Sequence, residues 1–201
     1  MEKFDILNPD GTPTGRVKER SLVHRDGDLH GTVHIWLARK NSFGRWEILL
    51  QKRSDQKDSF PGCYDISSAG HIPAGEGFLD SAMRELKEEL GICADPEELC
   101  FVGMHRARYE GEFHGKPWNN DELSAVYVLY RDIDTSEMQI QREELSGVRW
   151  MEYENCLENL HNPKFPNCIF EDELKMLGVY LNGKRDQDQC HADSGPQQDS
   201  V

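Results

Sequence analysis

The sequence has few basic residues for its length. Its 201 residues include 23 Lys and Arg but 37 Asp and Glu, which gives a formal net charge of -14. Proteins that bind a nucleic-acid backbone use clustered Lys and Arg to displace counterions, so this balance argues against a nucleic acid as partner. A small anionic ligand is still compatible with the charge if local basic groups or a bound cation supply the attraction.

Long hydrophobic runs and paired cysteines are also missing. No segment approaches the eighteen or more apolar residues of a membrane span, and the start MEKFDILNPDG has no basic segment followed by an apolar one. The six cysteines are scattered without a Cys-x-x-Cys pair, so they suggest neither a zinc site nor a small disulfide scaffold. We therefore expect a soluble, cytoplasmic protein.

The composition is that of one folded domain followed by a tail. A hydrophobic content of 37% over this length is enough for one buried core. From residue 182 onward the sequence NGKRDQDQCHADSGPQQDSV has almost no apolar residues. The sequence therefore predicts a domain over residues 1–181 and a disordered polar tail over residues 182–201.

Hydrophobic periodicity predicts strands interrupted by helices. A hairpin around the turn NPDG is expected at 4–24, and further strands at 31–40, 46–53, 66–72, 98–110, 122–132 and 147–153. A polar loop is expected at 111–120. Helices are predicted at 78–90, where apolar residues recur at helical spacing and a glycine follows, and at 171–181. This alternation indicates an α/β layered domain with a mixed sheet.

The stretch MRELKEELGI crowds three carboxylates onto one face of the first predicted helix. Glu85 lies three residues before Glu88 and four before Glu89, so the side chains are neighbours about one turn apart. Like-charge neighbours at this spacing each cost roughly 0.2–0.5 kcal/mol. Such an all-oxygen face suits a hard cation, Mg²⁺ or Mn²⁺, that also binds substrate phosphates.

The segment GHIPAGEGFLDSAMRELKEELGI resembles the Nudix box, G-x5-E-x7-R-E-U-x-E-E-x-G-U, at every specified position. The resemblance implies a Nudix fold, an α/β/α sandwich with a mixed sheet, and a metal-dependent pyrophosphohydrolase. It also implies that Glu88 and Glu89 bind Mg²⁺ or Mn²⁺ together with the Gly70 carbonyl. Glu85 is expected to act as a further ligand or as the general base, and Arg84 to orient the carboxylates.

Residues outside the box complete the predicted site. Nudix hydrolases usually take one more carboxylate from a loop beyond the box, and Glu144 is the closest match by its spacing to the following strand. Glu122 and Glu143 are the alternatives for this role. Arg53 and Lys57 are expected to bind the diphosphate, because an acidic protein with a polyanionic substrate needs donors near the phosphates.

The flanking segments are similar to the isopentenyl diphosphate isomerase branch of the superfamily. The positions that match its three metal-binding histidines and one of its two acidic ligands are His24, His30, His71 and Glu122. The second acid falls on Asn120. Isomerases of this branch carry a reactive cysteine directly before the Gly-His pair, where this chain has Ala69, and a methyl group can do no acid/base work.

The sequence therefore predicts hydrolysis of a diphosphate linkage in a small organic or nucleoside diphosphate derivative, with an isoprenoid diphosphate among the leading choices. An isomerase-like enzyme and a Nudix domain that binds a ligand without catalysis are the alternatives. For the three histidines, a structural role and metal ligation are both open. No nucleic acid or membrane partner is expected, and family members are commonly monomers or homodimers.

Overall fold

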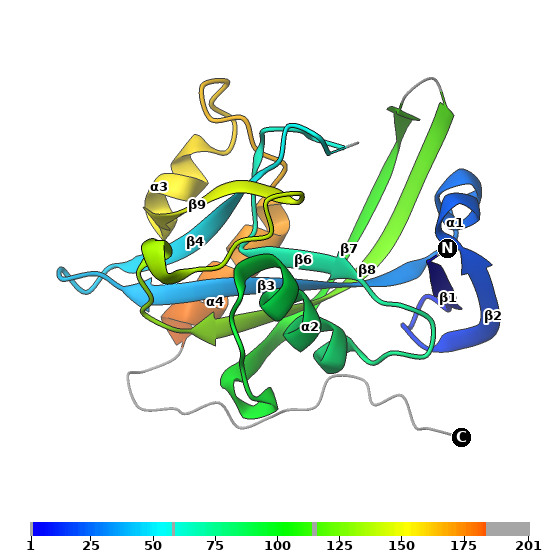
Figure 1. Cartoon of the computed structure of the whole chain (residues 1–201), viewed down its shortest axis with the longest axis horizontal. Helices are drawn as coiled ribbons and strands as arrows, with labels where there is room; N and C mark the ends of the chain where they lie inside the picture. Colours follow the sequence, from blue (N-terminus) through cyan, green and yellow to red (C-terminus); the bar gives the residue numbers. More distant parts are fainter. Residues whose placement is uncertain (1, 58, 114–115, 184–201) are drawn as a thin grey trace.

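The computed structural model describes residues 2–57, 59–113 and 116–183 (Figure 1). The strands are β1 (Lys3–Leu7), β2 (Pro13–Glu19), β3 (His30–Lys40), β4 (Trp46–Arg53), β5 (Tyr64–Asp65), β6 (Ser68–His71), β7 (Leu99–Phe113), β8 (Lys116–Tyr130) and β9 (Leu145–Glu152). The helices are α1 (Arg20–Asp26), α2 (Phe78–Leu90), α3 (Tyr153–Asn159) and α4 (Glu171–Gly183).

β3 is the centre of a mixed sheet. It pairs antiparallel with β4 near its C-terminal end and with β6 near its middle, and it pairs parallel with β8 along nearly its whole length. β7 continues the sheet beyond β8, and β9 continues it beyond β4. This arrangement confirms the predicted mixed sheet.

Helix α2 covers one face of this sheet. Its residues Leu86 and Leu90 pack in a buried cluster with Val33 and Ile35 of β3. Because successive side chains of a strand point to opposite faces, His34, the residue between these two, belongs to the other face.

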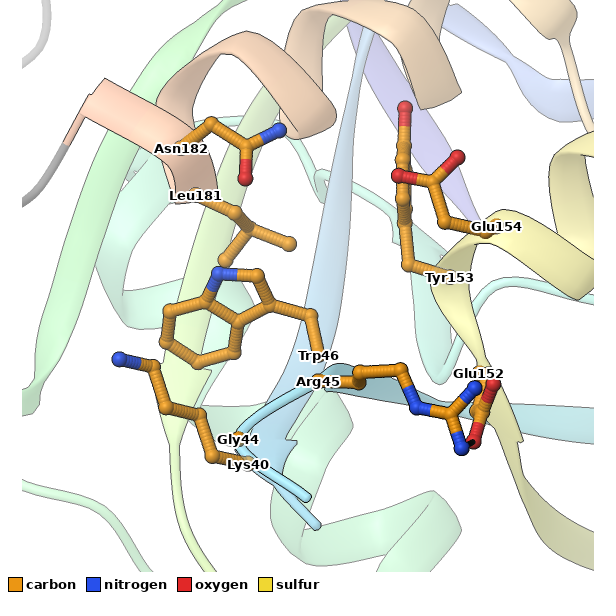
Figure 2. Close-up of a pocket in the computed structure, with 9 residues that line it drawn as sticks. All are labelled: Lys40, Gly44, Arg45, Trp46, Glu152, Tyr153, Glu154, Leu181 and Asn182. Atoms are coloured by element: carbon orange, nitrogen blue, oxygen red, sulfur yellow. Dashed lines mark ion pairs between the residues drawn. The ribbon is translucent and has the colours of Figure 1, made fainter.

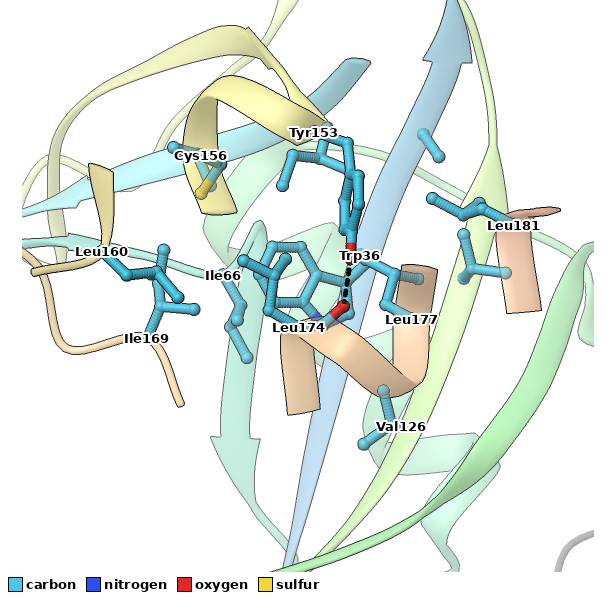
Figure 3. Packing of buried hydrophobic residues seen from close by; sticks show 14 of the residues in the cluster. Trp36, Ile66, Val126, Tyr153, Cys156, Leu160, Ile169, Leu174, Leu177 and Leu181 are labelled. Atoms are coloured by element: carbon cyan, nitrogen blue, oxygen red, sulfur yellow. Dashed lines mark hydrogen bonds between the residues drawn. The ribbon is translucent and has the colours of Figure 1, made fainter. Parts of the chain in front are cut away.

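Helices α3 and α4 cover that second face. Figure 3 shows Leu174 and Leu177 of α4 beside Trp36 of β3, within a second buried cluster. The hydroxyl of Tyr153, the first residue of α3, donates a hydrogen bond of 3.2 Å to the Leu174 carbonyl. The structure is therefore the predicted α/β/α sandwich, with its core divided between the two faces of the sheet (Figure 1).

The prediction for the end of the N-terminal hairpin is wrong. β1 and β2 pair antiparallel as expected, but residues 20–26 form the short helix α1 instead of continuing as strand. Gly27 ends this helix in the left-handed conformation, at φ 67°, and its N–H donates to the Val23 carbonyl. A glycine just past the last helical residue is the usual stop signal, and it was present in the sequence.

One further expectation is corrected, and one helix was not predicted. Residues 111–120 do not form a polar loop, because β7 extends to Phe113 and β8 begins at Lys116. Backbone pairing continues there, from Tyr109 opposite Asn120 to Phe113 opposite Lys116. Helix α3 was not predicted, since its seven residues are too few for helical periodicity to stand out.

The two predicted helices are present. α2 has the predicted bounds, and Gly91 follows it at φ 70° with its N–H donating to helix carbonyls. α4 runs two residues past the predicted domain end at 181, and the rest of the predicted tail, from residue 184, lies outside the described residues. Over the described parts of the chain, no helix has the length and apolar character needed to span a membrane.

Candidate active site

Two carboxylates of α2, those of Glu85 and Glu89, face strand β6. An ideal Cβ placed on Gly70 of β6 would lie only 2.1 Å from the Glu85 carboxylate carbon, so only a glycine allows this approach. The Gly70 backbone and the Glu85 side chain therefore lie in direct contact. Glu85 is largely buried, and burial raises the pKa of its carboxyl while the charge of Arg84 opposes that shift.

Arg84 holds three of the box carboxylates together. Its Nη1 lies 2.6 Å from Glu85 Oε1 and 3.2 Å from Glu88 Oε2, and its Nε lies 3.3 Å from Glu76 Oε1. Its Nη2 also donates to the His71 carbonyl at 3.2 Å. One guanidinium thus links the helix to the loop before it and to the end of β6.

Glu89 is the most buried of the three α2 glutamates, with 6% of its surface exposed. Its Oε2 accepts hydrogen bonds from Ser68 Oγ at 2.7 Å and from the Ala69 backbone N–H at 3.2 Å. Burial raises the pKa of Glu89 to about 8, and the neighbouring Glu85 and Glu144 charges add to the shift. Without a positive charge nearby, this carboxyl keeps its proton at neutral pH.

The predicted extra carboxylate lies next to this cluster. The loop that carries Glu144 is fixed to the end of α2, where the Gln141 N–H donates to the Glu89 carbonyl at 2.9 Å. Glu144 forms a close ion pair with Lys57, which was predicted independently to bind the diphosphate. The structure therefore brings Lys57, Glu144 and the α2 carboxylates to one place.

Arg53 has a different environment from Lys57. Its Nη1 donates to Asp65 Oδ2 at 3.0 Å, and its Nε and Nη2 donate to the Ser59 carbonyl at 3.1 and 3.0 Å. These contacts tie the end of β4 to the following loop. In this conformation the Arg53 guanidinium is hydrogen-bonded to Ser59 and Asp65. A substrate phosphate would have to share or replace these partners.

The histidines that match the isomerase branch come together beside β1. The ring centroids of His24 and His30 are 4.9 Å apart and those of His30 and His71 are 5.3 Å apart, and Phe4 stacks on the latter two rings. One nitrogen of each imidazole lies within 4.8 Å of the others. Glu122 Oε1 lies 3.3 Å from His71 Nε2. These three histidines could hold a metal ion, and Glu122 belongs with them, apart from the α2 carboxylates.

Burial controls the charge of this histidine cluster. It lowers the pKa of His24 to about 3, with the charges of His30 and His71 adding to the effect, and it also lowers the pKa of His30. Burial acts to raise the pKa of Glu122, but the hydrogen bond and charge of His71 outweigh it and hold that pKa well below its usual range. The cluster therefore combines neutral imidazoles at His24 and His30 with an ionised carboxylate at Glu122.

A third polar cluster joins His34, His105 and Glu173 beneath α4. The sequence placed His30 and His34 on one face of a strand but gave no reason to single out His105 or Glu173, which lie far away in the chain. Burial lowers the pKa of His34, yet the Glu173 carboxylate outweighs it and the net shift is upward. The same ion pair outweighs burial at Glu173 and lowers its pKa.

A hollow elsewhere on the molecule contains no predicted site residue among the residues that line it (Figure 2). It lies where β3 ends, whereas Gly70 pairs with Val33 near the middle of that strand. Its described lining consists of Lys40, Gly44, Arg45, Trp46, Glu152, Tyr153, Glu154, Leu181 and Asn182. We therefore place the candidate active site at α2 and β6.

Comparison with known proteins identifies the family. A model of the NUDIX domain matches residues 28–169, and the chain belongs to this family, as the box predicted. The chain is 43% identical over 188 residues to Nudix hydrolase 3 of Arabidopsis thaliana, a match that covers 91% of this chain. It spans only 22% of the length of that relative.

Two further likenesses bear on the branch and the fold. The chain is 28% identical over 153 residues to an isopentenyl-diphosphate Delta-isomerase of Saccharopolyspora erythraea, covering 76% of this chain and 73% of that protein. This likeness fits the branch indicated by the flanking segments. A crystal structure of a Deinococcus radiodurans protein superimposes with a TM-score of 0.64 at 20% identity, over 87% of this chain and 98% of that one, and shows the shared fold.

Proposed function

We propose that this chain is a metal-dependent pyrophosphohydrolase that cleaves a diphosphate linkage in a small organic or nucleoside diphosphate derivative. The observation that supports this most directly is the α2 carboxylate cluster, in which Glu85 contacts Gly70 and Glu89 lies buried behind β6. Two buried glutamates on one face of a helix are costly unless a cation compensates them.

The residues present fit Mg²⁺ or Mn²⁺. Glu85, Glu88 and Glu89 supply carboxylate oxygens and Gly70 supplies a backbone carbonyl, which is the oxygen donor set that hard dications prefer. The close approach of Gly70 to Glu85 and the raised pKa of buried Glu89 both indicate a site shaped for a positive charge. When bound, such an ion supplies positive charge to the phosphoryl oxygens and lowers the pKa of a coordinated water.

The other side chains have complementary tasks in the proposal. Arg84 fixes the direction of the Glu85 and Glu88 carboxylates, so that their oxygens are already oriented before substrate enters. Glu144 accepts the proton of the attacking water, with Glu85 as the alternative base. Lys57, which pairs with Glu144, lies where its ammonium can turn to a phosphate oxygen of the substrate.

Ala69 and the isomerase likeness together suggest the substrate class. The likeness to an isopentenyl-diphosphate isomerase favours an isoprenoid diphosphate, whereas the methyl group of Ala69 offers no group for moving a proton on its carbon chain. Hydrolysis of the same diphosphate needs no such group. We further propose that the enzyme acts in the cytoplasm, as a monomer or homodimer.

A panel of diphosphates tests the proposal. The purified chain is incubated with Mg²⁺ and isopentenyl diphosphate, geranyl diphosphate, nucleoside diphosphates and nucleoside diphosphate sugars, and the products are identified by mass spectrometry. We expect monophosphate products from at least one class and none in the presence of EDTA. Tight binding of a panel member without any cleavage would instead establish a ligand-binding Nudix domain.

Isomerisation is a second candidate function, favoured by the assembly of His24, His30 and His71 with Glu122. The two reactions are distinguished with isopentenyl diphosphate alone. Isopentenyl monophosphate and inorganic phosphate support hydrolysis, whereas dimethylallyl diphosphate would establish the isomerase and reject our main proposal.

A further inference from the structure

Three buried side chains from distant parts of the chain meet between the sheet and α4. His34 lies on β3, His105 on β7 and Glu173 on α4, and their exposed fractions are 8%, 7% and 0%. Figure 3 shows Trp36, the next residue on the same face of β3, packed under the turn of α4 that carries Leu174. An ionisable cluster in such a place needs strong internal compensation.

The three side chains converge on one point. Glu173 Oε2 lies 2.7 Å from His34 Nδ1 and 3.3 Å from His105 Nδ1, and the three potential ligand atoms all lie within 4.8 Å of one another. His105 Nδ1 is buried and has no hydrogen-bond partner within the described part of the chain, although it points at the carboxylate. A cation among these atoms would give His105 Nδ1 a partner and would replace the hydrogen bond between His34 Nδ1 and Glu173 Oε2.

A second set of residues holds the outer atoms of the same groups. His34 Nε2 lies 3.3 Å from Ser124 Oγ, and His105 Nε2 lies 3.1 Å from Asp172 Oδ2. The remaining oxygen of Glu173, Oε1, accepts a hydrogen bond of 2.9 Å from Trp36 Nε1. Both imidazoles are thus oriented with Nδ1 inward and Nε2 held from outside, which is how histidines that bind metals are commonly supported.

We propose that His34, His105 and Glu173 form a second metal site, which takes a transition dication such as Zn²⁺. Two imidazole nitrogens and one carboxylate are a donor set for Zn²⁺ and its neighbours, whereas Mg²⁺ prefers oxygen ligands. With Asp172 beside Nε2 of His105, the ring can direct Nδ1 to a dication that Glu173 also binds. A dication bound to both atoms ties α4 to the sheet.

The proposed site is separate from the α2 carboxylates and from the other histidine cluster. Ser68 of β6 bonds to Glu89 on the α2 face, while the adjacent Ala69 pairs with His34 and packs against the core of the α4 face. Along β3, His30 and His34 are four residues apart, about 13 Å at the usual rise of a strand. The inference therefore does not depend on the proposed hydrolase activity.

NMR spectroscopy of the imidazole nitrogens tests the proposal. The full-length, metal-stripped protein is titrated with Zn²⁺ alone as the probe. We expect one equivalent of Zn²⁺ to shift Nδ1 of His34 and His105 while their Nε2 atoms stay protonated, and millimolar Mg²⁺ to leave both unchanged. If Zn²⁺ leaves these two residues unchanged, or shifts only His24, His30 and His71, the proposal is wrong.

Variants give an independent readout by calorimetric titration with Zn²⁺ and by the melting temperature. Glu173→Gln keeps an oxygen for the Trp36 hydrogen bond, and His105→Asn keeps a polar side chain beside Asp172. Each should weaken Zn²⁺ binding at least tenfold and abolish the rise in melting temperature that Zn²⁺ gives the wild type. His71→Asn, in the other cluster, is the matched control. Equal loss in the control would contradict the proposal, and the wild-type resonances decide it if a variant does not fold.

Discussion

Glu89 of α2 and Ser68 of β6 are joined by a hydrogen bond of 2.7 Å from the serine hydroxyl to the carboxylate oxygen Oε2. This contact fixes the most buried carboxylate of the proposed active site against the strand that carries Gly70. It also places an ionisable group where burial raises its pKa to about 8. The charged carboxylate that metal binding requires at Glu89 therefore lowers the stability of the metal-free protein.

We predict that Glu89→Gln stabilises the metal-free protein at alkaline pH. Burial raises the pKa of Glu89 in the folded protein from its ordinary value of 4.5 to about 8. The wild type is therefore most stable below pH 4.5, and it loses stability as the pH rises through about 8. Glutamine has no such titration. In EDTA at pH 8, we expect the variant to have a free energy of unfolding on the order of 1–3 kcal/mol higher. Urea unfolding from pH 5 to pH 9 measures this, and a constant difference across that range would contradict it.

Gly70→Ala should displace Glu85. The added Cβ would lie 2.1 Å from the Glu85 carboxylate carbon, so that side chain must move away from β6. We expect a loss of about 1–3 kcal/mol in stability, as for other overpacked sites, together with loss of Mg²⁺-dependent turnover. Gly147→Ala on β9 is the matched control, because a Cβ there meets nothing within 4 Å. Normal activity of Gly70→Ala would show that the contact with Glu85 is not needed.

Arg84→Lys should reduce turnover by about 10- to 100-fold, the usual cost of losing a residue that orients metal ligands. Lysine keeps the positive charge but cannot bond Glu85, Glu88 and Glu76 at once with a planar fork. Steady-state kinetics at several Mg²⁺ concentrations measure the effect. Lys87→Gln, which removes an exposed positive charge from the same helix, should leave the kinetics within about twofold. Turnover of Arg84→Lys within about twofold of the wild type would reduce the role of Arg84 to its charge.

Substitutions of Lys57 and Glu144 should affect different steps, substrate binding for Lys57 and catalysis for Glu144. Lys57→Gln removes a donor to the phosphates, so we expect a higher KM with a smaller change in kcat. Glu144→Gln removes the proposed base, so we expect kcat to fall about 100-fold or more, in the upper part of the range for general base catalysis. The exposed neighbour Glu143 is the control, and Glu143→Gln should resemble the wild type. If Glu143→Gln and not Glu144→Gln lowers kcat, the assignment moves to Glu143.

The sequence predicted those features that depend on local pattern. The limits of α2 followed from apolar residues at helical spacing and from Gly91, and the Nudix box gave the residues of the carboxylate face. The contact of Gly70 with Glu85 was not predicted, since the family resemblance implied only that the Gly70 carbonyl binds the metal ion together with Glu88 and Glu89. α3 was missed because a helix of seven residues has too short a periodic signal.

Contacts between residues that are far apart in the chain could not be predicted from the sequence. Lys57 and Glu144 were each proposed for the site, but their ion pair depends on how two loops meet. The cluster of His34, His105 and Glu173 depends on the register of β3, on β7 and on the position of α4, none of which any local pattern encodes. Arg53 could equally have pointed at a substrate, and the structure shows it engaged with Asp65 and Ser59.

The central proposal is that the α2 carboxylates bind the cation needed for diphosphate hydrolysis. The most direct measurement is the Mg²⁺-dependent rate of the wild type and of Glu89→Gln on the best substrate of the panel, with Asp80→Asn, an exposed acidic residue of the same helix, as control. We predict no rate in EDTA, a fall of at least about 100-fold for Glu89→Gln because it loses a direct metal ligand, and a rate within about twofold of wild type for Asp80→Asn. Undiminished turnover by Glu89→Gln, or a wild-type rate that EDTA does not change, would contradict it.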